Sequence, residues 1–307
     1  MRFIKPFAGI SNGARLVLLI FLVFFGAMLS VALAYLAMMA IDGKSAFTDT
    51  GMMDNIRFVR VMQIFNQIGI FIIPPVLLAL LIEARPLEYL GFKKPAGIHI
   101  LGTFLLIMSI NPIIGWLMEV NEAMQLPESM QSIEQWMRNS ENTANELVEW
   151  ILSYTDASSM VINVFMVVLL PAVGEELLFR AVLIRLFNNI FKNIHIAVWV
   201  SAIIFSAFHF QFFGFLPRMF LGLFFGYIFI WSGSIWIPII AHFINNGTVV
   251  LITFLNSKGL ITESPQEFGT FESPLLLVSS IALTIMIGWL FYRTRNKPMP
   301  EELNARQ

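Results

Sequence analysis

Residues 159–187 read SMVINVFMVVLLPAVGEELLFRAVLIRLF. A helix rises 1.5 Å per residue, so about 20 apolar residues cross the roughly 30 Å hydrocarbon layer of a bilayer. A helix also satisfies its own backbone hydrogen bonds, which lipid cannot do. The stretch therefore predicts a membrane-spanning helix, and that helix carries Glu175, Glu176 and Arg180 into the apolar layer.

Runs of the same kind recur along the chain. They fall at 15–41, 59–82, 98–118, 159–187, 194–212, 214–232, 234–256 and 274–292. Hydrophobic residues make up 57% of the chain and charged residues 13%, whereas a soluble domain carries about 25% charged residues. We therefore predict an all-α fold, a polytopic bundle of about eight transmembrane helices.

Lysine and arginine gather at alternate joints between these runs. The clusters are Arg2, Lys5 and Arg15; Arg85, Lys93 and Lys94; Arg185 and Lys192; and Arg293, Arg295 and Lys297. Because basic residues are enriched on the cytoplasmic side of membrane proteins, both termini are expected in the cytoplasm. The pattern suits a multi-pass protein of a bacterial inner (plasma) membrane, and the run 15–41 is too long for a cleavable signal peptide.

The opposite side carries the acidic stretch 119–158. Its apolar residues follow a roughly helical spacing and are Trp136, Leu147, Trp150 and Ile151. This spacing indicates an amphipathic helix at the outer leaflet, and a solvated loop is the alternative. We divide the chain into residues 1–158, which end in this acidic stretch, a motif-bearing core at 159–256, and a last helix with a basic tail at 257–307.

Composition also excludes some functions. The net charge of -1 gives no reason to expect a nucleic-acid partner. The chain has no cysteine, which removes disulfides, thiolate metal sites and cysteine nucleophiles. The composition makes the lipid bilayer the expected partner.

Ionisable groups inside a bilayer cost about 2.5–3.5 kcal/mol on insertion scales, so they are candidates for function. The fourth, fifth and seventh runs carry them, as Glu175-Glu176-Leu-Leu-Phe-Arg180, Phe205-Ser-Ala-Phe-His209 and His242-Phe-Ile-Asn-Asn246. Residues four apart share one face of a helix, so Glu176 and Arg180 are expected to form an ion pair. We expect the three runs to bring these groups together.

Two chemistries fit this set of residues. In the first, Glu175 beside His209 acts as a general base on water, and His242 and Asn246 donate hydrogen bonds to the oxyanion. In the second, Glu175, His209 and His242 bind zinc, which activates the water. No His-Glu-x-x-His helix is present, so zinc would need ligands from separate helices. The residues alone leave both schemes open, and the first requires no cofactor.

The three motifs, in this order on successive membrane helices, resemble the CAAX-protease and bacteriocin-processing family, which includes the type II CAAX prenyl endopeptidases. The resemblance covers about residues 159–256. It implies an intramembrane endopeptidase with Glu175, His209, His242 and Asn246 at the catalytic centre and Glu176 and Arg180 in support. Eukaryotic members act on prenylated C-termini, so the resemblance implies a peptide or membrane-protein substrate that can carry a lipid. The metal-free scheme is the one we favour.

Other classes are also compatible with parts of the pattern. A non-catalytic scaffold or bacteriocin immunity protein would keep the bundle without the reaction, and a proton-coupled transporter would use the Glu and His residues as a relay. A serine nucleophile, such as Ser206, would leave the paired glutamates unexplained. Gly222 and Gly226 are expected to serve helix packing.

Overall fold

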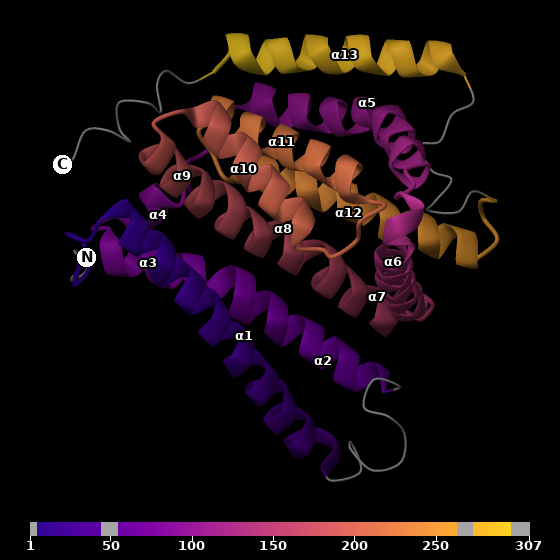
Figure 1. Ribbon diagram of the computed structural model, residues 1–307, viewed down its shortest axis with the longest axis horizontal. Helices are drawn as coiled ribbons and strands as arrows, with labels where there is room; N and C mark the ends of the chain where they lie inside the picture. The colour runs from indigo at the N-terminus through magenta and orange to yellow at the C-terminus, as the bar shows by residue number, and fades with distance from the viewer. Residues whose placement is uncertain (1–4, 44–54, 263–272, 296–307) are drawn as a thin grey trace.

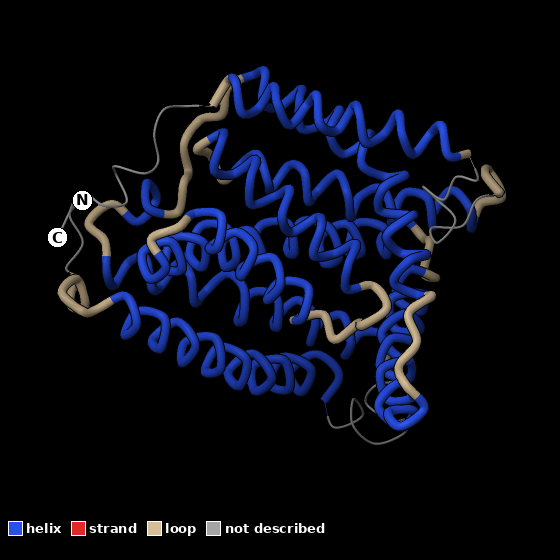
Figure 2. The backbone as a smooth tube through the Cα atoms, turned by 45° about the horizontal axis from the view of Figure 1, so that its top comes forward, coloured by secondary structure: helices blue, strands red, loops and turns tan. Residues whose placement is uncertain are grey.

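The computed structural model describes residues 5–43, 55–262 and 273–295. Every regular element in these ranges is a helix, which confirms the all-α prediction (Figures 1 and 2). The α-helices are α1 (Asn12–Asp42), α2 (Ile56–Asn66), α3 (Ile73–Ile82), α4 (Pro86–Tyr89), α5 (Gly97–Glu122), α6 (Gln131–Leu152), α7 (Ala157–Asn163), α8 (Leu170–Glu175), α9 (Ile184–Phe191), α10 (Ile194–Ala207), α11 (Phe215–Ser232), α12 (Trp236–Ser257) and α13 (Pro274–Arg293). The shorter turns are η3 (Gln67–Ile72), η4 (Glu128–Met130), η5 (Val164–Leu169) and η6 (Glu176–Leu183).

Seven helices within the described ranges are long and apolar enough to cross a membrane. They are α1, α5, α11, α12, α13 and the two composite helices Ile56–Ile82 and Ala157–Phe191. The predicted fifth run, 194–212, is an apolar helix of 14 residues, α10, which ends at Ala207. The chain is thus a multi-pass integral membrane protein with seven long helices and one shorter one.

Both composite helices contain π-helical turns next to prolines. Segment η3 ends directly before Ile73, Pro74 and Pro75, and η5 ends directly before Leu170 and Pro171. Proline has no N–H to donate to the carbonyl four residues earlier, so the regular α-helical ladder is interrupted there. A third π-helical segment, η6, begins at Glu176. Irregular turns of this kind are frequent at functional sites.

Helices α10 and α11 pack closely through two glycines, as predicted. A Cβ placed on Gly222 would lie 3.1 Å from Ala202 Cβ, and one on Gly226 would lie 2.9 Å from Val198 Cγ1. Small residues of this kind let two membrane helices approach each other. The contact holds α11 against the helix that leads to His209.

Different elements lie on the two sides of the bundle. The start of α1, the short helix α4 and the end of α13 lie on one side, while α6 lies on the opposite side (Figure 1). Within the acidic stretch 119–158, residues Gln131–Leu152 form α6, in agreement with the predicted helix. Its place at the outer leaflet and the side that faces the cytoplasm stay predictions.

Candidate active site

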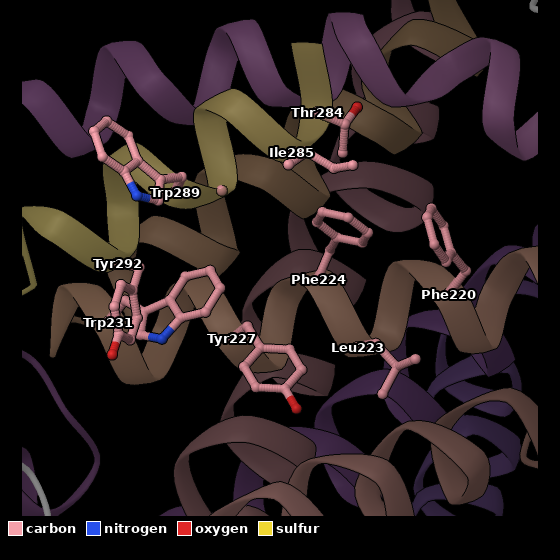
Figure 3. Close-up of a pocket in the computed structure, with 10 residues that line it drawn as sticks. Phe220, Leu223, Phe224, Tyr227, Trp231, Thr284, Ile285, Trp289 and Tyr292 are labelled. Carbon is pink, nitrogen blue, oxygen red and sulfur yellow. The ribbon is translucent and has the colours of Figure 1, made fainter. Parts of the chain in front are cut away.

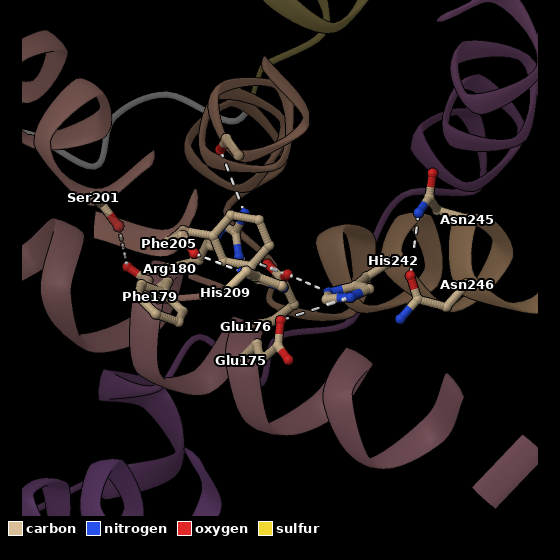
Figure 4. Close-up of polar contacts among 11 residues, drawn as sticks. Glu175, Glu176, Phe179, Arg180, Ser201, Phe205, His209, His242, Asn245 and Asn246 are labelled. Atoms are coloured by element: carbon tan, nitrogen blue, oxygen red, sulfur yellow. Dashed lines mark hydrogen bonds and ion pairs between the residues drawn. The ribbon is translucent and has the colours of Figure 1, made fainter. Parts of the chain in front are cut away.

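Polar groups from the three predicted motifs converge in the middle of the bundle. Glu175, Glu176 and Arg180 come from α8 and η6, His209 follows α10, and His242 comes from α12 (Figure 4). The exposed fractions of Glu176 and Arg180 are 0% and 1%, and those of Glu175 and His242 are 6% and 5%. Buried charges of this kind persist only when they are paired or hydrogen-bonded.

Glu176 is the group that ties two helices together. Arg180 Nη1 donates to Glu176 Oε1 at 2.7 Å, which confirms the predicted ion pair. His242 Nδ1 lies 2.8 Å from the same oxygen. Arg180 also stacks over the ring of Phe205, 4.4 Å from its centroid. The charge of Glu176 is therefore committed to Arg180 and His242.

His242 presents its other ring nitrogen to Glu175. An ionised Glu176 can only accept, so the Nδ1–H of His242 donates to it, and the neutral ring keeps a lone pair on Nε2. That Nε2 lies 3.9 Å from Glu175 Oε2. Glu175 Oε2 is buried and takes no hydrogen bond from any residue in the described ranges. Two acceptors that face each other in this way require a shared proton or a bridging water molecule.

His209 lies in the turn directly after α10. Its Nδ1 is 2.9 Å from the carbonyl oxygen of Phe205, which can only accept, so Nδ1 carries the proton and Nε2 keeps a free lone pair. The rings of Phe205 and His209 pack edge to face with centroids 5.1 Å apart. The ring of His242 also packs edge to face against Phe205, with centroids 6.3 Å apart. His209 and His242 therefore contact the same aromatic ring, and their joint action with Glu175 stays a prediction.

Asn246 lies one turn beyond His242 on α12, and Figure 4 draws it on the far side of His242 from the two glutamates. Its Nδ2 donates to the carbonyl of Val167 at 3.1 Å. Val167 lies four residues before Pro171, which has no N–H to offer that carbonyl. Asn246 therefore satisfies a carbonyl of the interrupted helix, and its role as an oxyanion donor stays a prediction.

The zinc alternative requires a ligand cluster. In the part of the chain that the structure describes, no three His, Cys, Asp or Glu side chains are grouped closely enough to hold a metal ion. The Nδ1 of His242 is already bound to Glu176, and its Nε2 stands 3.9 Å from Glu175. Glu175, His209 and His242 thus do not form a metal-ligand set in this arrangement.

Two residues near the site, Phe225 and Arg218, lie outside the three sequence motifs. Phe225 packs against both the His242 ring and the Arg180 guanidinium, at centroid distances of 5.6 Å and 5.3 Å. Arg218, near the start of α11, donates from Nη1 to the carbonyl of Gln211 at 3.3 Å, in the turn that follows His209. The sequence did contain a signal for Arg218, because this residue is a lone arginine near the start of a predicted membrane span, on the predicted outer side.

A separate cavity of 480 Å³ lies between α11 and α13 (Figure 3). Its lining is almost entirely apolar and aromatic and consists of Phe220, Leu223, Phe224, Tyr227, Trp231, Thr284, Ile285, Gly288, Trp289 and Tyr292. None of the converging polar residues lines it. The cavity is therefore distinct from the candidate active site.

Comparisons with known proteins find similarity in the part of the chain that carries the three motifs. Residues 157–248 match the family described as type II CAAX prenyl endopeptidase Rce1-like. The membrane-embedded CAAX protease MroQ of Staphylococcus aureus (strain USA300) is 36% identical over 110 residues, which are 34% of this chain and 44% of that protein. The uncharacterized protein YpbD of Bacillus subtilis (strain 168) is 31% identical over 86 residues, 27% of this chain and 41% of that protein.

The chain thus spans less than half the length of these curated relatives. No solved structure matches it. The relatives are bacterial, in agreement with the predicted multi-pass protein of a bacterial plasma membrane. The three motifs all lie within the matched residues, so the predicted resemblance to the CAAX prenyl endopeptidases is confirmed over residues 157–248.

Proposed function

We propose that the protein is an intramembrane endopeptidase in which Glu175 activates a water molecule. The observation that carries the proposal is the contrast between the two adjacent glutamates. Both glutamates have a buried Oε2 without a hydrogen-bond partner among the described residues, but Glu176 Oε1 is paired with Arg180 and His242 at 2.7 Å and 2.8 Å, whereas Glu175 Oε2 faces His242 Nε2 at 3.9 Å. A carboxylate in such a position is suited to take a proton from water.

In the first step, a water molecule beside Glu175 gives a proton to the carboxylate while its oxygen attacks the carbonyl carbon of the peptide bond. The free Nε2 of His209 accepts a hydrogen bond from the same water and orients its lone pair toward the substrate. The carbonyl double bond becomes a C–O⁻ single bond. The product of this step is a tetrahedral intermediate with one negative charge.

His242 is the group that we assign to this negative charge. We place the proton that His242 and Glu175 share on Nε2 of His242, which leaves Glu175 as the ionised base while Nδ1–H stays bound to the Glu176 carboxylate. Nε2–H then donates to the oxyanion in a water-poor site, where such a hydrogen bond is worth most. Asn246 is a second candidate donor, through the amide hydrogen that Val167 does not use.

In the second step, the intermediate collapses. The C–N bond breaks, the proton held by Glu175 passes to the leaving nitrogen, and the products are a carboxylic acid and an amine. Glu175 is then an ionised carboxylate again. We propose peptides of membrane-associated proteins, or their C-terminal segments, as the substrate class.

A cleavage assay tests this proposal. Purified protein in liposomes is incubated with a diverse library of membrane-associated peptides, and new termini are identified by mass spectrometry. We expect Glu175→Gln and His209→Ala each to lower the cleavage rate by about 10²–10⁴-fold, the usual contribution of a general base. Glu146→Gln, which removes a charge from an exposed part of α6, is the control and should cleave like the wild type.

The outcome separates the enzyme from the other classes. If the wild type produces no new termini but retains a peptide, the protein is a binding scaffold. If Glu175→Gln and His209→Ala both cleave at the wild-type rate, the assignment of the active site is wrong.

A further inference from the structure

The turn that carries His209 is irregular backbone within the membrane-embedded part of the protein. Helix α10 has 14 residues and rises about 21 Å, which is less than the roughly 30 Å of the hydrocarbon layer. Residues 208–214 then lead to α11 without forming a regular helix. Such backbone is tolerated at membrane depth only where its polar groups find partners in the protein or in a water-filled cavity.

Asn121 supplies two of these partners. It lies at the end of α5 and is buried. Its Nδ2 donates to the carbonyl of Phe212 at 3.1 Å, and its Oδ1 accepts from the N–H of Leu216 at 2.7 Å. One side chain therefore bridges the turn to the first residues of α11.

Helix α6 supplies the next partners. The N–H of Phe213 donates to Glu141 Oε2 at 2.8 Å, and Gln211 Nε2 donates to Asn145 Oδ1 at 2.8 Å. Glu141 and Asn145 are four residues apart and share a face of α6. One turn earlier on the helix, Arg138 lies over the ring of Phe213, 4.1 Å from its centroid. One face of α6 therefore contacts the turn that follows α10.

The turn itself adopts a conformation that needs such support. Phe210, directly after His209, has a φ of 53°, in the left-handed region that residues with a side chain seldom enter. A strained residue persists when its surroundings hold it in place. Ser206 Oγ, three residues before His209, donates to the carbonyl of Phe215 at 2.7 Å and closes the turn at its base.

We infer that Glu141 and Asn121 are positioning residues for His209: they hold the backbone of residues 212–216 and thereby fix the turn that carries the His209 ring. The inference gives the outer acidic helix a role in the reaction, and it rests on the proposed function in treating His209 as catalytic. A displacement of about 1 Å in a catalytic group can cost on the order of 10²-fold in rate.

The first measurement does not depend on activity. Because the chain has no cysteine, Ser206→Cys creates a single buried thiol at the base of the turn. Its rate of alkylation by a small maleimide in liposomes then reports how often the turn opens. This background is combined with Glu141→Ala, Glu141→Gln or the control Glu146→Ala, whose side chain is exposed on the same helix.

We expect Glu141→Ala to raise the alkylation rate by roughly tenfold, because a hydrogen bond to a charged group that limits local opening is lost. Glu141→Gln keeps an oxygen acceptor and should stay close to the control. Asn121→Ala should raise the rate further, since it removes two contacts at once. If Glu141→Ala and Asn121→Ala are both alkylated at the rate of Glu146→Ala, these side chains do not hold the turn.

The second measurement uses the cleavage assay on the natural chain. We expect Glu141→Ala to lower kcat by roughly 10- to 100-fold with little change in KM, and Glu141→Gln to restore most of it. An increase in alkylation without a fall in kcat would refute the positioning role. If the wild type cleaves nothing, the proposed function fails, and the alkylation rates still decide whether Glu141 and Asn121 hold the turn.

Discussion

His242 Nδ1 lies 2.8 Å from Glu176 Oε1, and this contact joins α12 to the middle of the composite helix 157–191. The same oxygen accepts from Arg180 at 2.7 Å. Glu175, the neighbouring residue in the sequence, accepts no hydrogen bond at Oε2 from any residue in the described ranges, and His242 Nε2 lies 3.9 Å from that oxygen. The two adjacent carboxylates therefore differ in role. Glu176 stabilises the packing of α12 against the composite helix, and Glu175 is available for the proposed reaction.

This division predicts opposite effects on stability. Glu176→Gln leaves the buried Arg180 guanidinium without its counter-charge, and breaking a buried pair typically costs 3–5 kcal/mol. We expect a clearly lower melting temperature in detergent for Glu176→Gln. Glu175→Gln removes a buried charge whose contact with His242 Nε2, at 3.9 Å, is longer than either contact of Glu176, so its melting temperature should equal or exceed that of the wild type while cleavage is lost.

Thermal unfolding followed by tryptophan fluorescence checks both variants in one detergent. Equal melting temperatures for the two variants would contradict the assignment of the structural role to Glu176.

Close packing of α10 and α11 predicts a cost for enlarging Gly222. A Cβ there would lie 3.1 Å from Ala202 Cβ and 3.3 Å from Phe205 Cδ1. Overpacking of this kind typically costs about 1–3 kcal/mol, so Gly222→Ala should lower the melting temperature. Because Phe205 also contacts His209 and Arg180, cleavage should fall as well.

Gly288→Ala on α13 is the matched control, since nothing lies within 4 Å of the added methyl group. The better helix propensity of alanine should leave Gly288→Ala as stable as the wild type or slightly more so. A Gly222→Ala variant that is as stable as Gly288→Ala would show that the two helices can separate without cost.

Metal removal distinguishes the two schemes of water activation. Under the glutamate scheme, extended dialysis against a strong chelator should leave the cleavage rate unchanged, and elemental analysis should find no stoichiometric metal in active protein. Loss of activity that added zinc restores would show that Glu175, His209 and His242 rearrange into a ligand set.

Asp156 predicts a pH dependence of stability outside the membrane layer. Hydrogen bonds from the Ser158 hydroxyl, and then from Ser159 and the backbone N–H groups at the start of α7, hold the pKa of Asp156 well below its usual range. A carboxyl group with a depressed folded-state pKa stabilises the fold above its unfolded pKa of about 3.9 and loses this effect as the pH falls further.

The comparison variant is Asp156→Asn, which still caps the helix but does not ionise. At pH 7 the wild type should melt at a higher temperature than Asp156→Asn, and the difference should shrink as the pH falls below about 4. A difference that is constant with pH would mean that the charge of Asp156 contributes nothing.

The sequence predicts most of the bundle because hydropathy reports the need for internally satisfied backbone in lipid. The run 159–187 appears as the composite helix 157–191, and four-residue spacing predicted the Glu176–Arg180 pair. The predicted end of the fifth run, at residue 212, was wrong, because α10 ends at Ala207. Residues FHFQFF at 208–213 are as apolar as a membrane-spanning helix, so hydropathy extended the run over them. What ends the helix is the turn at His209 and Phe210, which side-chain hydropathy does not register.

The same limit applies to the site. The motifs identified the ionisable residues, since charges in an apolar run stand out. They gave no indication that Asn246 would bind the carbonyl of Val167, or that Asn121 would reach the turn after α10, because these contacts join segments 79 to 95 residues apart in the chain. Such partners depend on how the helices pack against one another.

The shortness of α10 has a consequence for the lipid around the protein. A helix of about 21 Å beside neighbours that span the full layer leaves a local step in the hydrophobic surface, and lipids adjust to such a step by thinning. For the proposed hydrolysis, thinning of the lipid beside α10 would shorten the path of water to Glu175. Hydrolysis inside a bilayer needs such a supply, and lipids with longer acyl chains would restrict it.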